Sequence, residues 1–221
     1  AVVRVASSRA SLTRDVVTLF HHLTGYSRSP RFEKLLVAPL NMRTRFVDLI
    51  AREAANARAG LPARIVVKVN QLEDGPICEA LCDASNAGVP IDLIVRGFCC
   101  LRPGIPGVSE NIRVISILGR FLEHSRAFLF RNGGKEEVLI SSADLMPRNL
   151  DRRVEVLVPI EHPKHREWLD QVLTFDFSDV VRWELRPDDT WERVGRHDKF
   201  EPDAQDLMHR WTIERQHQVR R

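Results

Sequence analysis

Predicted strands and amphipathic helices alternate in the first half of the chain, and this order restricts the folds open to it. Short apolar stretches at 34–39, 64–69 and 90–97 predict three strands. Apolar residues at helical spacing fill the two intervals between them, and the predicted helices end at Gly60 and Gly88. A strand–helix–strand–helix–strand order favours parallel strands joined by right-handed crossovers, so we expect an α/β fold.

In the second half of the chain, strands follow one another with shorter connections. The Gly-rich segment 131–136 predicts a hairpin turn, and 163–177 predicts an amphipathic helix. A further helix is expected near the start, from a cap at Ser11 or Thr13 to Gly25. The expected strands are 112–118, 126–130, 137–141, 153–160, 181–185 and 190–194. Together these elements predict a mixed sheet with helices packed on its faces.

The composition is that of an ordinary globular domain, with 43% hydrophobic and 29% charged residues. Because the sequence holds no apolar run of membrane-spanning length and no signal-peptide pattern, we expect a cytoplasmic protein. A net charge of +3 is too small to predict nucleic-acid binding. The four cysteines are expected to be reduced thiols, and the two in a predicted helix, Cys78 and Cys82, to pack in the core, in preference to a zinc site or a catalytic thiol. The other two are Cys99 and Cys100.

Four polar features lie near predicted strand ends, where ligands gather in open α/β sheets. Arg96 ends one predicted strand, and His124 comes shortly before another. The segment 141–149 follows a third strand. Glu155 interrupts an apolar strand, and an inward-facing carboxylate there needs a partner.

These side chains suit an anion-binding site. Arg96, Arg126 and Arg148 can form paired hydrogen bonds with phosphate oxygens, which arginine does better than lysine. His124 can donate or accept a proton near neutral pH, and Glu155 can hold a histidine in one tautomer. Such a set suits phosphoryl transfer, although the sequence has neither a GxxxxGKS/T loop nor a kinase-type glycine loop.

Each feature also has a purely structural interpretation, which the sequence leaves open. Arg96 can be a surface arginine, and His124 a histidine with a local hydrogen-bond partner. Asp144 can belong to the anion site or to a turn or helix cap. Backbone N–H groups of the segments 131–134 and 141–144 are possible further donors to an anion.

Two long segments closely resemble the C-terminal region of the bacterial ATP-dependent polyphosphate kinases. They are IDLIVRGFCCLRPGIPGVSENIRVISILGRFLEHSRAFLFRNGG, which starts at Ile91, and SSADLMPRNLDRRVEVLVPI, which starts at Ser141. The shorter segments VTLFHHLTGYS and KLLVAPLNMR also resemble this family. The resemblance covers roughly residues 13–186, and the string that ends in GRFLEHSR is its most specific part.

The resemblance implies an ATP–polyphosphate phosphotransferase with two C-terminal domains, each similar to half of a phospholipase D. The first domain's histidine would carry the phosphate covalently, and His124 would assist as an acid or base. Arg96 would contact the nucleotide phosphates, and Glu155 would support the histidine pair. Arg126 and Arg148 are assigned to phosphate binding from charge and placement alone.

The resemblance also implies the ligands and partners of the full-length protein. They are ATP or ADP, inorganic polyphosphate, and Mg²⁺ whose ligands are expected upstream of this chain. A homo-oligomer and peripheral association with membranes are implied as well, and no nucleic-acid partner is expected.

The same resemblance divides the chain into three parts. Residues 1–31 would be the tail of a preceding phospholipase D-like domain, 32–200 the last C-terminal domain, and 201–221 a polar tail or loose helix. The chain begins without Met and its first apolar residues look like a strand already under way, so we expect a piece of a longer protein. The phosphate-carrying histidine would lie upstream, because neither His21 nor His22 has a lysine two residues later. The isolated chain is therefore expected to make no polyphosphate.

Two other functions stay open on the sequence alone. One is a phosphodiesterase of the phospholipase D superfamily, which would need two such halves and usually a lysine where Arg126 stands. The other is a non-catalytic module that binds polyphosphate.

Overall fold

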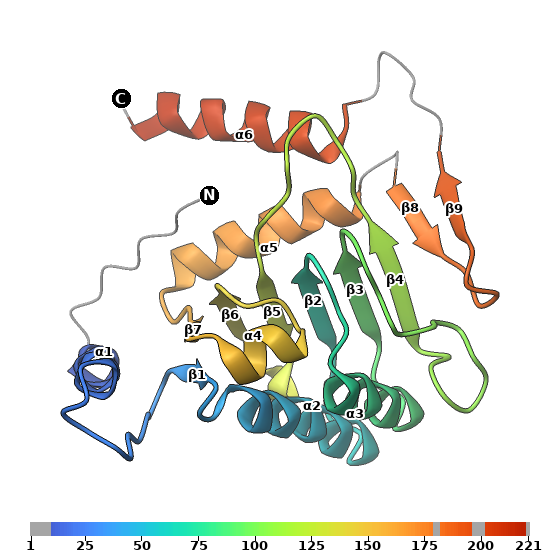
Figure 1. Ribbon diagram of the computed structural model, residues 1–221. Helices are drawn as coiled ribbons and strands as arrows, with labels where there is room; N and C mark the ends of the chain where they lie inside the picture. Colours follow the sequence, from blue (N-terminus) through green and yellow to red (C-terminus); the bar gives the residue numbers. More distant parts are fainter. Residues whose placement is uncertain (1–9, 179–181, 196–201, 220–221) are drawn as a thin grey trace.

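Nine strands form one sheet in the part of the chain that the computed structural model describes, residues 10–178, 182–195 and 202–219 (Figure 1). The strands are β1 (Leu36–Ala38), β2 (Ile65–Val69), β3 (Ile91–Val95), β4 (Ile112–Ser116), β5 (Ala127–Phe130), β6 (Glu137–Ser141), β7 (Glu155–Pro159), β8 (Arg182–Leu185) and β9 (Trp191–Val194). The helices are α1 (Ala10–Leu23), α2 (Met42–Arg58), α3 (Gly75–Asn86), α4 (Pro147–Arg152), α5 (Pro163–Phe177) and α6 (Ala204–Val219), with a 3₁₀ turn at Asn132–Gly134. The strand expected among the first residues lies outside the described residues.

The sheet is mixed, as predicted, with the order β1-β7-β6-β5-β2-β3-β4-β8-β9. β2, β3 and β4 run parallel, and every other neighbouring pair is antiparallel. The expected parallel pairing of β1 with β2 is wrong, since β1 pairs with β7 instead. Local chain order favoured the β1–β2 pair, but the later antiparallel strand β5 occupies the position beside β2.

Helices cover both faces of the central strands. Phe46 of α2 is fully buried against one face, with its ring edge-on to Phe128 at 5.0 Å and to Phe130 at 5.7 Å. Leu173 of α5 packs on the other face, in a second cluster that includes Val66. Because both faces are covered, all five residues of β2 are buried, which explains its nearly continuous apolar sequence.

The C-terminal stretch, expected to be a polar tail or a loose helix, contains α6, which packs against α5. Trp211 of α6 lies 6.1 Å from Trp168 and 5.8 Å from Phe175 between ring centroids. A few aromatic residues thus attach a helix that is otherwise polar. No helix in the described part of the chain is both long enough and apolar enough to cross a membrane.

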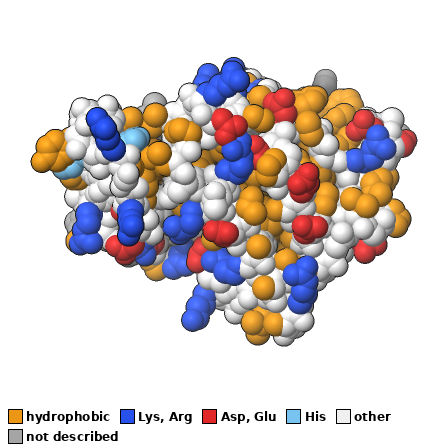
Figure 2. Space-filling model, turned by 60° about the horizontal axis from the view of Figure 1, so that its bottom comes forward, with side chains coloured by type: hydrophobic (Ala, Val, Ile, Leu, Met, Phe, Trp, Pro, Cys, Tyr) orange, Lys and Arg blue, Asp and Glu red, His pale blue; other side chains and the backbone are white. Residues whose placement is uncertain are grey.

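Helix α1 is attached to the sheet domain by a buried carboxylate. Asp15 accepts hydrogen bonds from three consecutive backbone N–H groups, of Glu33 at 3.0 Å, Lys34 at 2.6 Å and Leu35 at 2.9 Å. The apolar residues whose helical spacing predicted this helix are exposed to solvent rather than buried. Hydrophobic side chains are visible at the α1 end of the molecule (Figure 2). These exposed residues are Val16, Val17, Phe20 and Leu23.

Candidate functional site

Polar residues from five strand ends meet at one edge of the sheet. Asn70 follows β2 and Arg96 follows β3, and these ends are neighbours because the two strands are parallel. β5 runs antiparallel to β2, so His124 and Arg126, which precede β5, lie at the same edge. The end of β6 and the start of β7, at Glu155, complete it.

This edge holds a pocket of about 400 Å³. All six side chains singled out from the sequence line it, namely Arg96, His124, Arg126, Asp144, Arg148 and Glu155. Their convergence is the geometric part of the sequence prediction, and the structure confirms it. Five further polar residues line it, namely Asn70, Gln71, Ser142, Asn149 and Arg153. Ser142 and Asn149 belong to the segment 141–149 that was singled out from the sequence, whereas the other three were not predicted.

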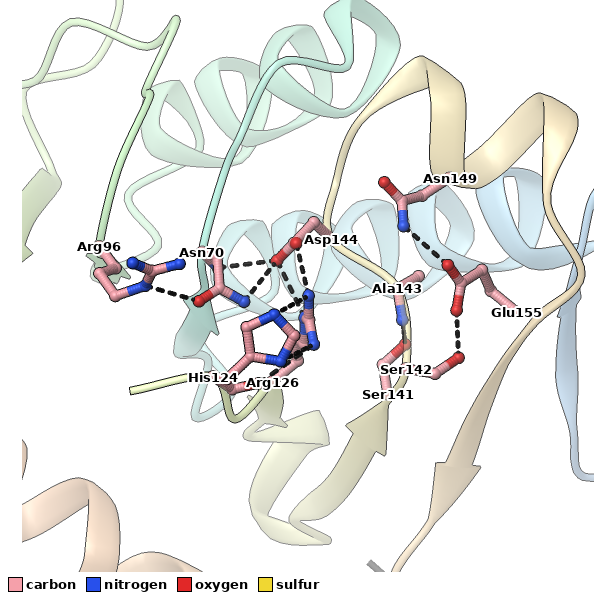
Figure 3. A network of polar contacts seen from close by, with 10 residues as sticks. All are labelled: Asn70, Arg96, His124, Arg126, Ser141, Ser142, Ala143, Asp144, Asn149 and Glu155. Carbon is pink, nitrogen blue, oxygen red and sulfur yellow. Dashed lines mark hydrogen bonds and ion pairs between the residues drawn. The ribbon is translucent and has the colours of Figure 1, made fainter. Parts of the chain in front are cut away.

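Asp144 is the centre of the polar network in this pocket (Figure 3). Its carboxylate accepts hydrogen bonds from the backbone N–H of Asn70 at 2.8 Å and from the side-chain amide of Asn70 at 3.1 Å. It also accepts from Nε of Arg126 at 3.0 Å and from Nη2 at 2.6 Å. Burial raises the pKa of Asp144, but the bonds from Arg126 and Asn70 outweigh it and lower the pKa below its ordinary value. Asp144 is therefore a charged anchor rather than a turn or cap residue.

Arg126 connects this anchor to the imidazole. Its Nη1 donates to the backbone oxygen of His124 at 3.1 Å and lies 3.0 Å from ring atom Nδ1, while Nη2 lies 3.4 Å from Nε2. A guanidinium can only donate, so the shorter contact assigns Nδ1 as the acceptor. The neutral ring then carries its proton on Nε2.

The charge state of His124 follows from its neighbours. Partial loss of contact with water lowers the pKa of His124, the positive charges of Arg126 and Arg96 lower it further, and Asp144 opposes them. The net shift is downward. The imidazole is thus mainly neutral at neutral pH and can give or take a proton.

The arginines of the pocket fall into two groups. Arg126 has its donors engaged by Asp144 and His124. Within the described part of the chain, Arg96 donates only its Nε, to the amide oxygen of Asn70 at 2.8 Å, and both of its terminal nitrogens are left for a ligand. Among the described residues, no carboxylate lies within ion-pair distance of Arg96, Arg148 or Arg153, so these three carry the unneutralised positive charge of the pocket.

Glu155 lines the pocket without touching the histidine. It accepts a hydrogen bond from the hydroxyl of Ser142 and one from the side-chain amide of Asn149 at 2.8 Å. β6 lies between β7 and β5, which separates the start of β7 from the start of β5 by two strand spacings, about 10 Å. Among the described contacts Glu155 makes none with His124, and Arg126 lies beside the ring instead. That Glu155 supports a histidine pair stays a prediction.

The glycine-rich turn at 131–134 was wrongly considered a source of anion donors. It follows the far end of β5 from His124, and its amides are already bonded. The N–H of Asn132 donates to Glu53 at 2.8 Å, and that of Gly133 to the backbone oxygen of Pro62 at 3.0 Å. The direction of β5 explains this position, because the turn and His124 lie at opposite ends of that strand.

The pocket does not fit a resident metal ion. Within the described residues, no group of three or more His, Cys, Asp and Glu could hold one. The two carboxylates of the pocket already accept bonds, Asp144 from Arg126 and Asn70, and Glu155 from Ser142 and Asn149. That Mg²⁺ is bound by residues outside this chain stays a prediction.

The cysteines do not form an alternative site. Cys78, Cys82 and Cys99 pack against the main hydrophobic cluster. Burial raises the pKa of Cys78 to about 12 and that of Cys99 to about 11, so both are protonated thiols at neutral pH. The expected packing of Cys78 and Cys82 agrees with this, whereas Cys100 is exposed.

Comparison with known proteins places this geometry in a family. A family model described as polyphosphate kinase C-terminal domain 2 matches residues 35–205. The chain belongs to the polyphosphate kinase family. It is 56% identical over 184 residues to a polyphosphate kinase of Synechocystis, which is 83% of this chain and 25% of that protein. It is 52% identical over 180 residues to one of Streptomyces coelicolor, which is 81% of this chain and 24% of that protein.

The fold comparison agrees with this family. The crystal structure of a polyphosphate kinase from Porphyromonas gingivalis matches with a TM-score of 0.87 and 38% identity, covering 96% of this chain and 33% of that chain. A phospholipase D family member, Nuc from Salmonella typhimurium, matches with a TM-score of only 0.44 and 15% identity over 62% of this chain. The latter similarity says nothing about function. The chain spans about a quarter of the length of the curated polyphosphate kinases that it matches.

Proposed function

We propose that this chain is part of an enzyme that reversibly transfers the terminal phosphate of ATP to polyphosphate, and that the pocket around His124 is part of its active site. The observation that carries the proposal is that the imidazole of His124 lines the same pocket as Arg96, for which no carboxylate partner is found among the described residues. Family membership supports the same reaction, since the relatives are named polyphosphate kinases.

Arg96 is the first phosphate ligand in this proposal. Asn70 fixes its Nε, so the guanidinium is oriented and its two terminal nitrogens can bind two oxygens of one phosphate. Arg148 and Arg153 extend the positive potential along the pocket, where the further phosphates of a polyanion would bind. Arg126 contributes less directly, because it already supports the imidazole.

His124 moves the proton. In the first half-reaction, a P–N bond forms on a carrier histidine, the bond from the γ-phosphorus to the bridging oxygen breaks, and ADP leaves with that oxygen. The Nε2 proton of His124 is shared with the leaving oxygen and stabilises its charge. In the second half-reaction the P–N bond breaks and a terminal oxygen of polyphosphate takes the phosphoryl group.

The carrier histidine of this proposal lies outside these residues. Among the described residues that line the pocket, His124 is the one histidine. Mg²⁺ would neutralise phosphate charge, with its protein ligands also elsewhere. A homo-oligomeric state and a cytoplasmic location belong to the same proposal.

The test is the reaction itself, measured on the intact protein that includes this chain. Incubation with ATP labelled at its terminal phosphate, Mg²⁺ and a polyphosphate primer is expected to give labelled polymer and one ADP for each phosphate added. Unlabelled polymer, together with hydrolysis of a phosphodiester such as bis-nitrophenyl phosphate, would support the phospholipase D-type alternative and contradict the proposal.

Replacing Arg96 by lysine in the intact protein is expected to raise the KM for ATP about tenfold, because an ammonium cannot form two parallel bonds to one phosphate or keep the Nε bond to Asn70. Initial rates over a range of ATP concentrations measure it. Arg58→Lys in the last turn of α2 is the matched control, since Arg58 is exposed and does not line this pocket. An unchanged KM for Arg96→Lys would remove Arg96 from nucleotide binding.

A further inference from the structure

The segment that carries His124, residues 118–125, has little support from its own backbone. It connects β4 to β5 without regular secondary structure. Its backbone makes no hydrogen bond to the backbone of another described residue. Phe121 and Leu122 are 60% and 72% exposed, so apolar packing holds the segment only weakly.

Cavities lie on both sides of this segment. The candidate pocket is on one side, and a second cavity of about 620 Å³, lined largely by apolar residues of β6, β7 and α5, is on the other. His124 and Arg126 line both cavities, so the segment is part of the wall between them. Neighbouring atoms therefore restrict the position of the imidazole less than they would in a packed core.

Helix α6 supplies the missing restraint through Gln205, which is 8% exposed. Its side-chain oxygen accepts from the N–H of Phe121 at 2.8 Å, and its side-chain nitrogen donates to the backbone oxygen of Phe121 at 2.8 Å. The amide thus satisfies both backbone groups of one residue, as a neighbouring strand would. The same nitrogen also donates to the carboxylate of Glu123 at 3.2 Å.

Glu123 in turn reaches the interior. Its other oxygen lies 3.2 Å from the ammonium of Lys68, and that ammonium lies 2.5 Å from the carboxylate of Asp176 on α5. Lys68 is only 4% exposed and Asp176 only 1%. The buried ammonium of Lys68 therefore holds both carboxylates in place, because breaking either ion pair leaves a charge without its partner away from water.

We propose that Gln205 is a positioning residue for His124 and that it acts through the Gln205 network, made of Gln205, Glu123, Lys68 and Asp176. The network attaches residues 118–125 to α6, β2 and α5 at once, and so fixes the residue next to His124 in the chain. This proposal rests on the proposed function of His124 in phosphoryl transfer. It makes α6, which is otherwise a polar C-terminal helix, a functional part of the site.

The experiment compares Gln205→Ala with the wild type in the intact protein. The variant is expected to lower kcat for polyphosphate synthesis about tenfold and to leave the KM for ATP unchanged, because Arg96 and Asn70 are not in the network. Hydrogen–deuterium exchange of the peptide that contains Phe121 should become faster, because the amide loses its acceptor. Gln216→Ala, the same change at an exposed position of α6, should change none of these values.

A second variant reaches the same contact from the other side. A Cβ at Gly119 would lie 2.6 Å from the side-chain oxygen of Gln205, so Gly119→Ala should displace the amide from Phe121. It is expected to reproduce the loss of kcat and the faster exchange while Gln205 itself is intact. This variant keeps the test decisive if Gln205→Ala lowers the stability of α6.

The outcomes separate the two proposals. A wild-type protein that makes no polyphosphate would overturn the proposed function and the positioning role that depends on it. An active wild-type protein whose Gln205→Ala and Gly119→Ala variants keep their kcat despite faster exchange would overturn the positioning role alone. Unchanged exchange in both variants would show that Gln205 does not hold the segment.

Discussion

Replacing His124 by alanine in the intact protein is expected to lower polyphosphate synthesis about 1,000-fold, the range that a single general acid or base contributes. The fold should persist, because His124 is exposed and its ring contacts only Arg126 among the described residues. Initial rates with saturating ATP measure the loss, and the thermal midpoint checks the fold. His165→Ala, at an exposed histidine of α5 away from the pocket, is the matched control and should keep full activity.

Two results would contradict this role of His124. A variant with wild-type rates would remove the imidazole from the mechanism. A variant with a much lower thermal midpoint would instead assign His124 a structural role, which its exposure does not predict.

Replacing Asp144 by alanine is expected to cost about 3 kcal/mol of unfolding free energy and most of the activity. Asp144 and Arg126 are both nearly buried, with side chains 11% and 10% exposed. The substitution leaves the guanidinium of Arg126 without its counter-ion, and it removes the acceptor of the backbone N–H and the side-chain NH₂ of Asn70. Urea denaturation measures the first effect and the rate of polymer formation the second. Asp151→Ala on α4, an exposed carboxylate that pairs with Arg43, should cost less stability and little activity.

The stability that Asp144 contributes should depend on pH in one direction. Its pKa is lower in the folded protein than its ordinary value, so the contribution is complete above the ordinary carboxyl pKa. It is lost as the pH falls through the folded value. The stability difference between wild type and Asp144→Asn should therefore be largest near neutral pH and shrink in acid. A difference that is constant or grows in acid would contradict the charged-anchor role.

The site residues that could be predicted from the sequence are those that stand beside a clearly predicted strand. Arg96 and His124 lie next to strands whose apolar runs are clear, and strand direction then brings them to one edge of the sheet. Asn70 was missed although it stands directly after β2, as Arg96 does after β3. This position was visible in the sequence, but a single asparagine is so common after strands that it does not by itself indicate a binding site.

The parts that were not predictable depend on pairings between distant segments. Glu155 and His124 are separated by β6, and only the strand order shows this. Lys68 of β2 pairs with Asp176 of α5, which lies 108 positions away in the chain, and the sequence around Lys68 shows only a strand with one charged residue. The role of α6 was hidden for a similar reason, because Gln205 and Trp211 contact residues far away in the chain.

The central claim is that phosphate binds between Arg96 and the neutral imidazole of His124. The most direct test is the pKa of His124, measured by NMR titration of its ring in the intact protein, with and without tripolyphosphate. Without the anion, the pKa should lie below the ordinary histidine value, because reduced contact with water and the charges of Arg126 and Arg96 disfavour the imidazolium. With saturating tripolyphosphate, the pKa should rise, since the bound negative charge stabilises the imidazolium. A pKa that stays the same or falls would place the phosphate elsewhere and contradict the account.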